Sequence, residues 1–111
     1  MATAQTLIAA VGPLPLSATF NSEGDGYVLF YVSGSAWSAT PGSSISFTLY
    51  LDNQAIGTSA GFTNEAQSHK TLVPIFIPAK ISYGQHTVEL QIESSVTNTD
   101  YNDNFTVTLI Y

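Results

Sequence analysis

The chain of 111 residues carries only two Lys or Arg residues against eight Asp or Glu residues, and its formal net charge is −6. Neutralising phosphates needs several basic side chains on one face, so this composition argues firmly against nucleic acid and anionic membranes as partners. The length is that of one domain, and we expect residues 1–111 to form a single β-sandwich. Without cysteine, neither disulfides nor thiolate metal sites contribute.

The N-terminal segment Met1–Val11 has no basic n-region, and polar residues interrupt its apolar stretch. We therefore expect no secretory signal and no membrane insertion, which leaves the cytoplasm or release by a non-classical route and does not fix the compartment. Sparse charge combined with 44% hydrophobic residues has three interpretations. Either much surface is buried between subunits, or a Ser/Thr/Tyr surface serves neutral polar ligands. An ordinary acidic β-domain with neither property is the third.

Apolar residues recur with period two and turn residues arrive at short intervals, so every predicted element is a strand. The predicted strands are 5–10, 14–20, 27–32, 44–52, 54–60, 71–79, 87–93 and 105–111. Both faces of Tyr27–Val32 are apolar, so both should be covered. The pair Asp52-Asn53 predicts a hairpin turn. Pro74 and Pro78 remove ladder donors, which indicates an edge position or a bulge.

In the strand 44–52, alternation places Ile45, Phe47 and Leu49 inward and Ser46 and Thr48 outward. The segment 33–43 is expected to be a loop. About eight strands at this spacing predict an all-β fold, an antiparallel two-sheet jelly-roll sandwich. The alternative is an immunoglobulin-like sandwich, because 49–57 and 84–88 look like the hairpins of bacterial adhesin repeats.

Several segments occur in the order seen in a known superfamily. Gly26–Val32 reads as an aromatic strand after a glycine turn, Ile45–Leu51 as the next strand, and Asn102–Phe105 as the lead into a terminal strand. This order resembles the trimeric jelly rolls of the complement-globular-head and tumour-necrosis-factor-like superfamily. Shorter strings such as Val32–Ala36 and Gly84–Thr87 look like small bacterial β-domains, which implies a fold and no activity.

The resemblance implies three protomers packed around an axis through their aromatic strands. The residues it places at the interface between copies are Tyr27, Leu29, Tyr31 and Tyr111.

Ligand-binding candidates lie in two polar loops. Trp37 stands in a Ser/Gly/Pro loop, where an exposed indole is a common platform for sugars, although it can equally plug the end of the sandwich. His69, with Glu65 and Asn64, offers a metal or acid–base pair, or simply a polar loop surface.

Asp100, Asn102 and Asp103 group hard oxygen donors in one loop, which is the chemistry that calcium selects. The string Asp100–Asp103 also resembles the calcium loop of small bacterial fucose- and mannose-binding lectins. Those lectins carry acidic residues further upstream, where this chain has Ser94 and Asn98. In the alternative interpretation the Asx side chains only satisfy turn amides. Calcium is the one cofactor that the sequence offers.

No nucleophile elbow, P-loop or zinc-ligand spacing occurs, so we expect a protein that is not an enzyme. The first hypothesis is a homotrimeric, lectin-like binding module whose partners are its own copies and a glycan. The alternative is a structural or trimerising tip, or a capping domain of a fibre or particle, without a small-molecule ligand.

Overall fold

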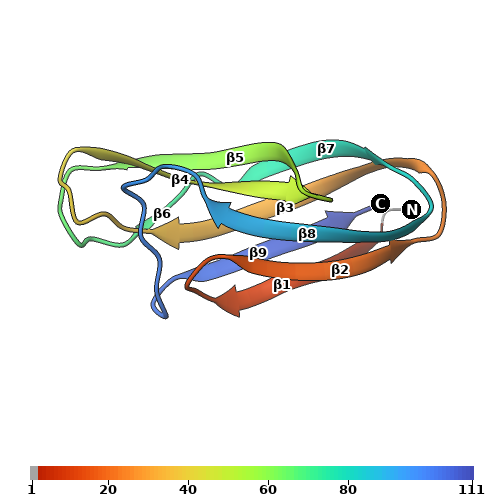
Figure 1. Cartoon of the computed structure of the whole chain (residues 1–111), viewed down its shortest axis with the longest axis horizontal. Helices are drawn as coiled ribbons and strands as arrows, with labels where there is room; N and C mark the ends of the chain where they lie inside the picture. Colours follow the sequence, from red (N-terminus) through yellow and green to blue (C-terminus); the bar gives the residue numbers. More distant parts are fainter. Residues whose placement is uncertain (1–2) are drawn as a thin grey trace.

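The computed structural model describes residues 3–111, and every regular element in them is a β-strand (Figure 1). The strands are β1 (Ala4–Val11), β2 (Leu16–Ser22), β3 (Gly26–Ala36), β4 (Ser43–Leu51), β5 (Gln54–Thr63), β6 (Lys70–Thr71), β7 (Ile75–Ile81), β8 (Gly84–Ile92) and β9 (Asn104–Ile110). Over this range no helix is long and apolar enough to cross a membrane.

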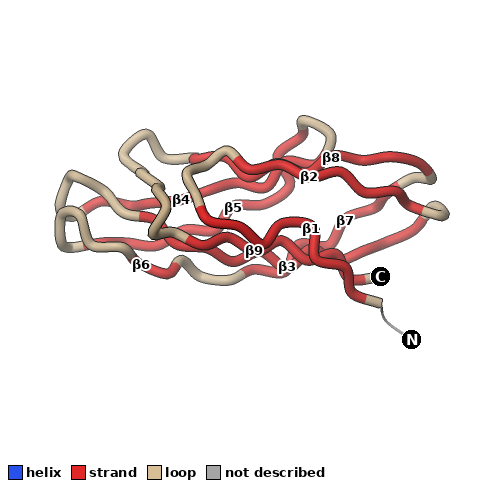
Figure 2. The backbone as a smooth tube through the Cα atoms, turned by 90° about the horizontal axis from the view of Figure 1, so that it is seen from below, coloured by secondary structure: helices blue, strands red, loops and turns tan. Residues whose placement is uncertain are grey.

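The strands form two antiparallel sheets that lie one upon the other (Figure 2). In one sheet β9 lies between β1 and β3, and both β6 and β7 pair with the other edge of β3. The second sheet has the order β2-β8-β4-β5. The predicted antiparallel two-sheet jelly-roll sandwich is therefore confirmed.

Two of the differences from the predicted boundaries have local causes. The expected strand 71–79 is divided into β6 and β7 around Pro74, which has no amide hydrogen to donate to a ladder. The expected loop 33–43 begins later, because β3 continues to Ala36 with its burial still alternating. The longer β3 reaches the end of the sandwich where the β8–β9 loop lies.

The core lies between the sheets and is built from the inward positions of the alternating strands. Phe30 of β3, Phe47 of β4 and Phe105 of β9 are fully buried. The rings of Phe47 and Phe105 meet edge to face, with centroids 5.6 Å apart. Such contacts across the two layers join the sheets, since burial contributes about 25 cal/mol per Å² of apolar surface.

Ser46 and Thr48 face away from this core, as predicted, yet both are buried. The β8–β9 loop covers them: the Ser46 amide donates to the Thr97 hydroxyl over 3.0 Å, and the Thr48 hydroxyl donates to Glu93 over 2.8 Å. The β4–β5 turn was predicted correctly. Asp52 and Asn53 have φ values of 49° and 68°, as a two-residue type I′ turn requires.

Gly34 in β3 provides the clearest stability test in the core. A Cβ built there would lie 2.8 Å from Cε1 of Phe105 and 3.0 Å from Cζ of Phe47. We expect Gly34→Ala to lower the free energy of unfolding by about 1–3 kcal/mol, since an extra methyl overpacks the core. Urea unfolding measures this, with Gly24→Ala as control, because a Cβ at Gly24 meets nothing within 4 Å. An unchanged Gly34→Ala midpoint would show that the rings can move aside.

Candidate functional site

The outer surface of the β3-containing sheet carries an aromatic patch. Outward side chains of β3 lie opposite outward side chains of β7, with Tyr31 paired to Phe76 and Leu29 to Pro78. Tyr27 is 78% exposed and Phe76 is 61% exposed. The Tyr31 and Phe76 rings pack together with centroids 5.2 Å apart. We call these five residues, Tyr27, Leu29, Tyr31, Phe76 and Pro78, the aromatic face.

Three of the residues predicted for a subunit interface lie on this face, namely Tyr27, Leu29 and Tyr31. Tyr111 does not: it follows β9, exchanges backbone hydrogen bonds with Thr3, and lines a separate pocket with Leu109. The chain's own loops leave Tyr27 largely uncovered. Contact between copies through this face stays a prediction.

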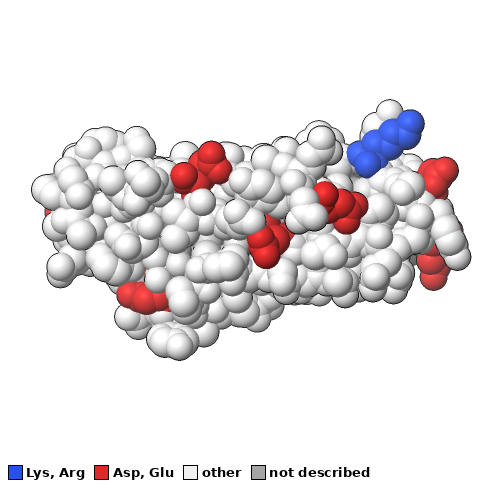
Figure 3. Space-filling model, viewed as in Figure 1, with Lys and Arg blue, Asp and Glu red and all other residues white. Residues whose placement is uncertain are grey.

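The aromatic face is nearly free of charge. Lys80 lies at one end, with its ammonium 5.9 Å from the centre of the Tyr27 ring. On the other side of β3, Thr108 pairs with Tyr31 and Ile110 pairs with Leu29. On the side of the molecule shown in Figure 3, charged side chains are likewise isolated and most of the surface is uncharged. The aromatic face is therefore an apolar strip bordered by a hydroxyl and one ammonium group.

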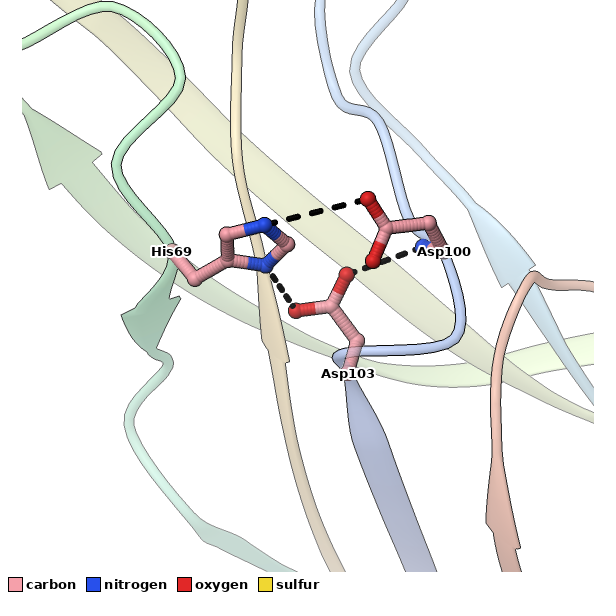
Figure 4. A group of neighbouring side chains, drawn as sticks. All are labelled: His69, Asp100 and Asp103. Carbon is pink, nitrogen blue, oxygen red and sulfur yellow. Dashed lines mark hydrogen bonds and ion pairs between the residues drawn. The ribbon is translucent and has the colours of Figure 1, made fainter.

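At the end of the sandwich where β3 ends, His69 lies between two carboxylates (Figure 4). Its Nδ1 is 2.8 Å from Oδ1 of Asp103, and its Nε2 is 3.8 Å from Oδ2 of Asp100. Asp103 is fully buried, and it also accepts a hydrogen bond of 2.7 Å from the Ser35 hydroxyl and one of 2.9 Å from the Asp100 amide. Candidate ligand atoms of His69, Asp100 and Asp103 all lie within 4.8 Å of one another.

The structure thus brings two of the three residues predicted for calcium together and adds His69 to them. Asn102 is exposed, and its backbone amide donates to Oδ1 of Asp100 over 2.8 Å. This bond and the one from the Asp100 amide are the Asx-to-turn bonds of the alternative interpretation. Calcium at Asp100, Asn102 and Asp103 stays a prediction.

The four predicted ligand-binding residues are only partly brought together. The Trp37 and His69 rings have centroids 5.9 Å apart, whereas Asn64 and Glu65 are exposed and Glu65 is not part of the His69 cluster. Trp37 exchanges backbone hydrogen bonds with Asn98, and its Nε1 is buried without a hydrogen-bond partner. The indole therefore does not offer its donor edge to solvent, which favours its role as a plug.

A second histidine pair, missed by sequence reasoning, lies beside the β4–β5 turn. Nδ1 of His86 is 2.6 Å from Oδ2 of Asp52, and its Nε2 is 2.7 Å from the Ser82 carbonyl. Both residues line a pocket of about 620 Å³ together with Asp25, Gln54 and Lys80. Only the antiparallel pairing of β4 with β8 brings Asp52 to His86, so no local motif announces the pair.

In the folded protein the pKa of His86 is raised and the pKa of Asp52 is lowered. Hydrogen bonds to Asp52 and to the Ser82 carbonyl raise the pKa of His86, because both acceptors favour the doubly protonated ring. Burial by itself would raise the pKa of Asp52, but the hydrogen bonds from His86 and the Thr87 amide outweigh it and lower that pKa.

We expect a pH-dependent stability from this pair. The raised pKa of His86 contributes stability that is complete below the ordinary histidine pKa and is lost as pH rises through the folded-state pKa. The lowered pKa of Asp52 contributes stability above the ordinary aspartate pKa, which is lost as pH falls. The melting temperature of the wild type should therefore fall as pH rises from about 6 to 8. The melting temperature of His86→Gln should fall less over the same pH range. Parallel curves for both proteins would contradict this.

Comparisons with known proteins identify the fold. The sequence matches no protein-family model and no curated protein. Among solved structures, the family 35 carbohydrate-binding module of Cellvibrio japonicus Abf62 is similar over 100% of this chain and 93% of its own, with a TM-score of 0.56 at 9% identity. The C-terminal domain of the sugar-binding protein EclA matches over 100% of this chain and 77% of its own, with a TM-score of 0.51 at 16% identity.

Latent PorU from Porphyromonas gingivalis is also similar, with a TM-score of 0.61 at 8% identity over 95% of this chain. This chain spans only 10% of PorU. At these identities the similarity establishes a small jelly-roll domain. The narrower resemblance to complement globular heads and tumour-necrosis-factor-like proteins stays a prediction.

Proposed function

We propose that this protein is a non-catalytic carbohydrate-binding module and that the aromatic face is its glycan-binding surface. The observation that carries the proposal is that exposed Tyr27, half-buried Tyr31 and exposed Phe76 lie on adjacent strands of one nearly uncharged sheet surface. An aromatic ring presents an apolar face to the C–H groups of a sugar, and a tyrosine hydroxyl adds a polar end.

The spacing of the rings favours an extended glycan over a single sugar. Tyr27 and Tyr31 lie four residues apart on β3, a separation of about 13 Å at roughly 3.3 Å per strand residue. Phe76 extends the platform sideways onto β7. A neutral glycan is favoured, because the net charge of −6 repels anionic polymers, and among residues 3–111 the cation found beside the face is Lys80.

The similar structures support this proposal through their fold. Two of them are named as carbohydrate-binding or sugar-binding, and this chain spans most of the length of each. Trp37, Asn64, Glu65 and His69 remain a second possible contact region at the loop end of the sandwich. We place the ligand on the aromatic face because Tyr27 and Phe76 are exposed to solvent, whereas the indole nitrogen of Trp37 is buried.

A panel of neutral and anionic polysaccharides in native affinity gels tests the function. The wild-type protein should be retarded by at least one neutral polysaccharide and should migrate unchanged through gels containing anionic ones. Migration unchanged by every polysaccharide of the panel would contradict the proposal. Retardation by the anionic polymers alone would contradict the assignment to an uncharged face.

A second candidate function is self-association through the same face, as in the predicted homotrimer. The exposed fractions of Tyr27 (78%), Phe76 (61%) and Leu29 (39%) favour it, because apolar side chains gathered on one surface mark interaction sites. Light scattering separates the two candidates. A glycan-binding face predicts the 11.8 kDa monomer, whereas a trimer has three times that mass. If a trimer forms, Tyr27→Ser should dissociate it.

A further inference from the structure

We propose that Nε2 of His69 and Oδ2 of Asp100 bind a divalent transition-metal ion of the zinc class, with Asp103 as the residue that positions the His69 ring. This site lies at the loop end of the sandwich and does not depend on glycan binding by the aromatic face. The inference begins with the hydrogen bonds of Asp103.

Those bonds fix the position of the proton on His69. Asp103 is fully buried and accepts hydrogen bonds from the Ser35 hydroxyl, the Asp100 amide and Nδ1 of His69. Since a carboxylate only accepts, Nδ1 must carry the hydrogen in the pair with Asp103. In the neutral ring this leaves the Nε2 lone pair free. A carboxylate that holds the other ring nitrogen is the usual partner of a metal-binding histidine, because it fixes the tautomer and the ring orientation.

The free nitrogen points toward another electron-rich atom. Nε2 lies 3.8 Å from Oδ2 of Asp100, which is too long for a hydrogen bond. Two ligands at about 2.0–2.2 Å from one zinc ion are about 3.3–3.6 Å apart in a tetrahedron and further apart at wider angles. The observed separation needs only a small adjustment of Asp100. Both side chains are partly exposed, at 32% and 38%, so an ion and its water ligands can reach them (Figure 4).

The donor set selects the class of metal. An imidazole nitrogen suits zinc, copper and nickel, whereas calcium takes six to eight oxygen ligands. The Asp103 oxygens accept three hydrogen bonds from protein donors, and the backbone amide of the exposed Asn102 donates to Asp100. We therefore expect zinc to bind and calcium to bind far more weakly. With water completing the coordination, binding should be weaker than in a closed four-ligand site.

The chain contains an internal comparison in its second histidine. His86 also pairs with an aspartate through Nδ1, but its Nε2 is 2.7 Å from the Ser82 carbonyl. That nitrogen is a donor to a backbone oxygen and has no lone pair to offer. Both histidines pair with an aspartate through Nδ1, yet only His69 leaves its other ring nitrogen available.

Calorimetric titration of the chelator-treated protein with zinc chloride tests the proposal. Wild type should bind one zinc ion, and His69→Gln or Asp100→Asn should lower the affinity about 10-fold or more. Asp103→Asn should lower it about 10- to 100-fold, as expected for a residue that orients a ligand. Tyr101→Ala, in the same loop and 78% exposed in the wild type, should bind as wild type does. A melting curve for each variant shows that it is folded.

A second measurement does not depend on the variants. Substoichiometric Cu²⁺ should broaden the NMR signals of the His69 ring and leave those of His86 sharp. Equal broadening of both rings, zinc affinity unchanged in His69→Gln and Asp100→Asn, or calcium binding as tightly as zinc would each overturn the proposal. Calcium binding that is lost in Asn102→Ala would instead support the oxygen-only site predicted from the sequence.

Discussion

Replacing Tyr31 with alanine is expected to lower the affinity for a neutral glycan at least tenfold, a loss of about 1.4 kcal/mol or more. Tyr31 lies at the centre of the aromatic face, between Phe76 on β7 and Thr108 on β9. Phe76→Ala should have a similar effect, because the Tyr31 and Phe76 rings pack together with centroids 5.2 Å apart. For the same reason the double variant should lose less than the sum of the single losses. Calorimetry with the polysaccharide that retards the wild type measures all three.

Tyr83→Ala is the matched control for these variants. Tyr83 is 75% exposed, as Tyr27 is at 78%, but it lies in the β7–β8 turn outside the aromatic face. Its affinity should equal that of the wild type. If Tyr31→Ala and Phe76→Ala bind normally while Trp37→Ala or His69→Ala does not, the glycan binds at the loop end and the aromatic face is not the site.

Phe105→Ala is expected to destabilise the fold by about 3–5 kcal/mol, the range for removing a large buried aromatic side chain. Phe105 is 1% exposed, packs edge to face on Phe47, and fills the space left by Gly34 across the β3–β9 pairing. This is a large share of the roughly 5–15 kcal/mol that keeps a small domain folded. Urea unfolding monitored by circular dichroism measures it.

Phe62→Ala removes the same side chain from a different environment. Phe62 lies on the edge strand β5 and is 58% exposed, so its variant should change stability by about 0.5 kcal/mol or less. Equal losses for Phe62→Ala and Phe105→Ala would contradict the assignment of Phe105 to the core between the two sheets.

Local patterns were sufficient to predict most of the strands and one turn, but not the division of 71–79 or the full length of β3. Alternation in the strand 44–52 correctly placed Ile45, Phe47 and Leu49 in the core and Ser46 and Thr48 on the opposite face, because successive residues of a strand point to opposite faces. Asp52-Asn53 was recognised because few residues tolerate two successive positive φ values. In contrast, the burial of Ser46 and Thr48 depends on a loop about 50 residues away in sequence, and no local signal encodes it.

In the candidate sites, too, local sequence indicated single residues but not the contacts between distant ones. The apolar character of both sides of Tyr27–Val32 was evident from the sequence, and the interface predicted at Tyr27, Leu29 and Tyr31 stays a prediction. Phe76 joins them only through the pairing of β3 with β7. Likewise, His69 and Asp103 were singled out separately, but they lie 34 residues apart and meet only in the folded chain. The residue types were therefore predictable, and their partners were not.

Chemical-shift mapping during a glycan titration tests the central claim most directly. With a neutral oligosaccharide from the polysaccharide that retards the protein, the largest NMR shifts should occur at Tyr27, Tyr31 and Phe76 and at their neighbours on β3, β7 and β9. Largest shifts at Trp37, His69 and the β8–β9 loop, or none at saturating sugar, would contradict a glycan-binding aromatic face.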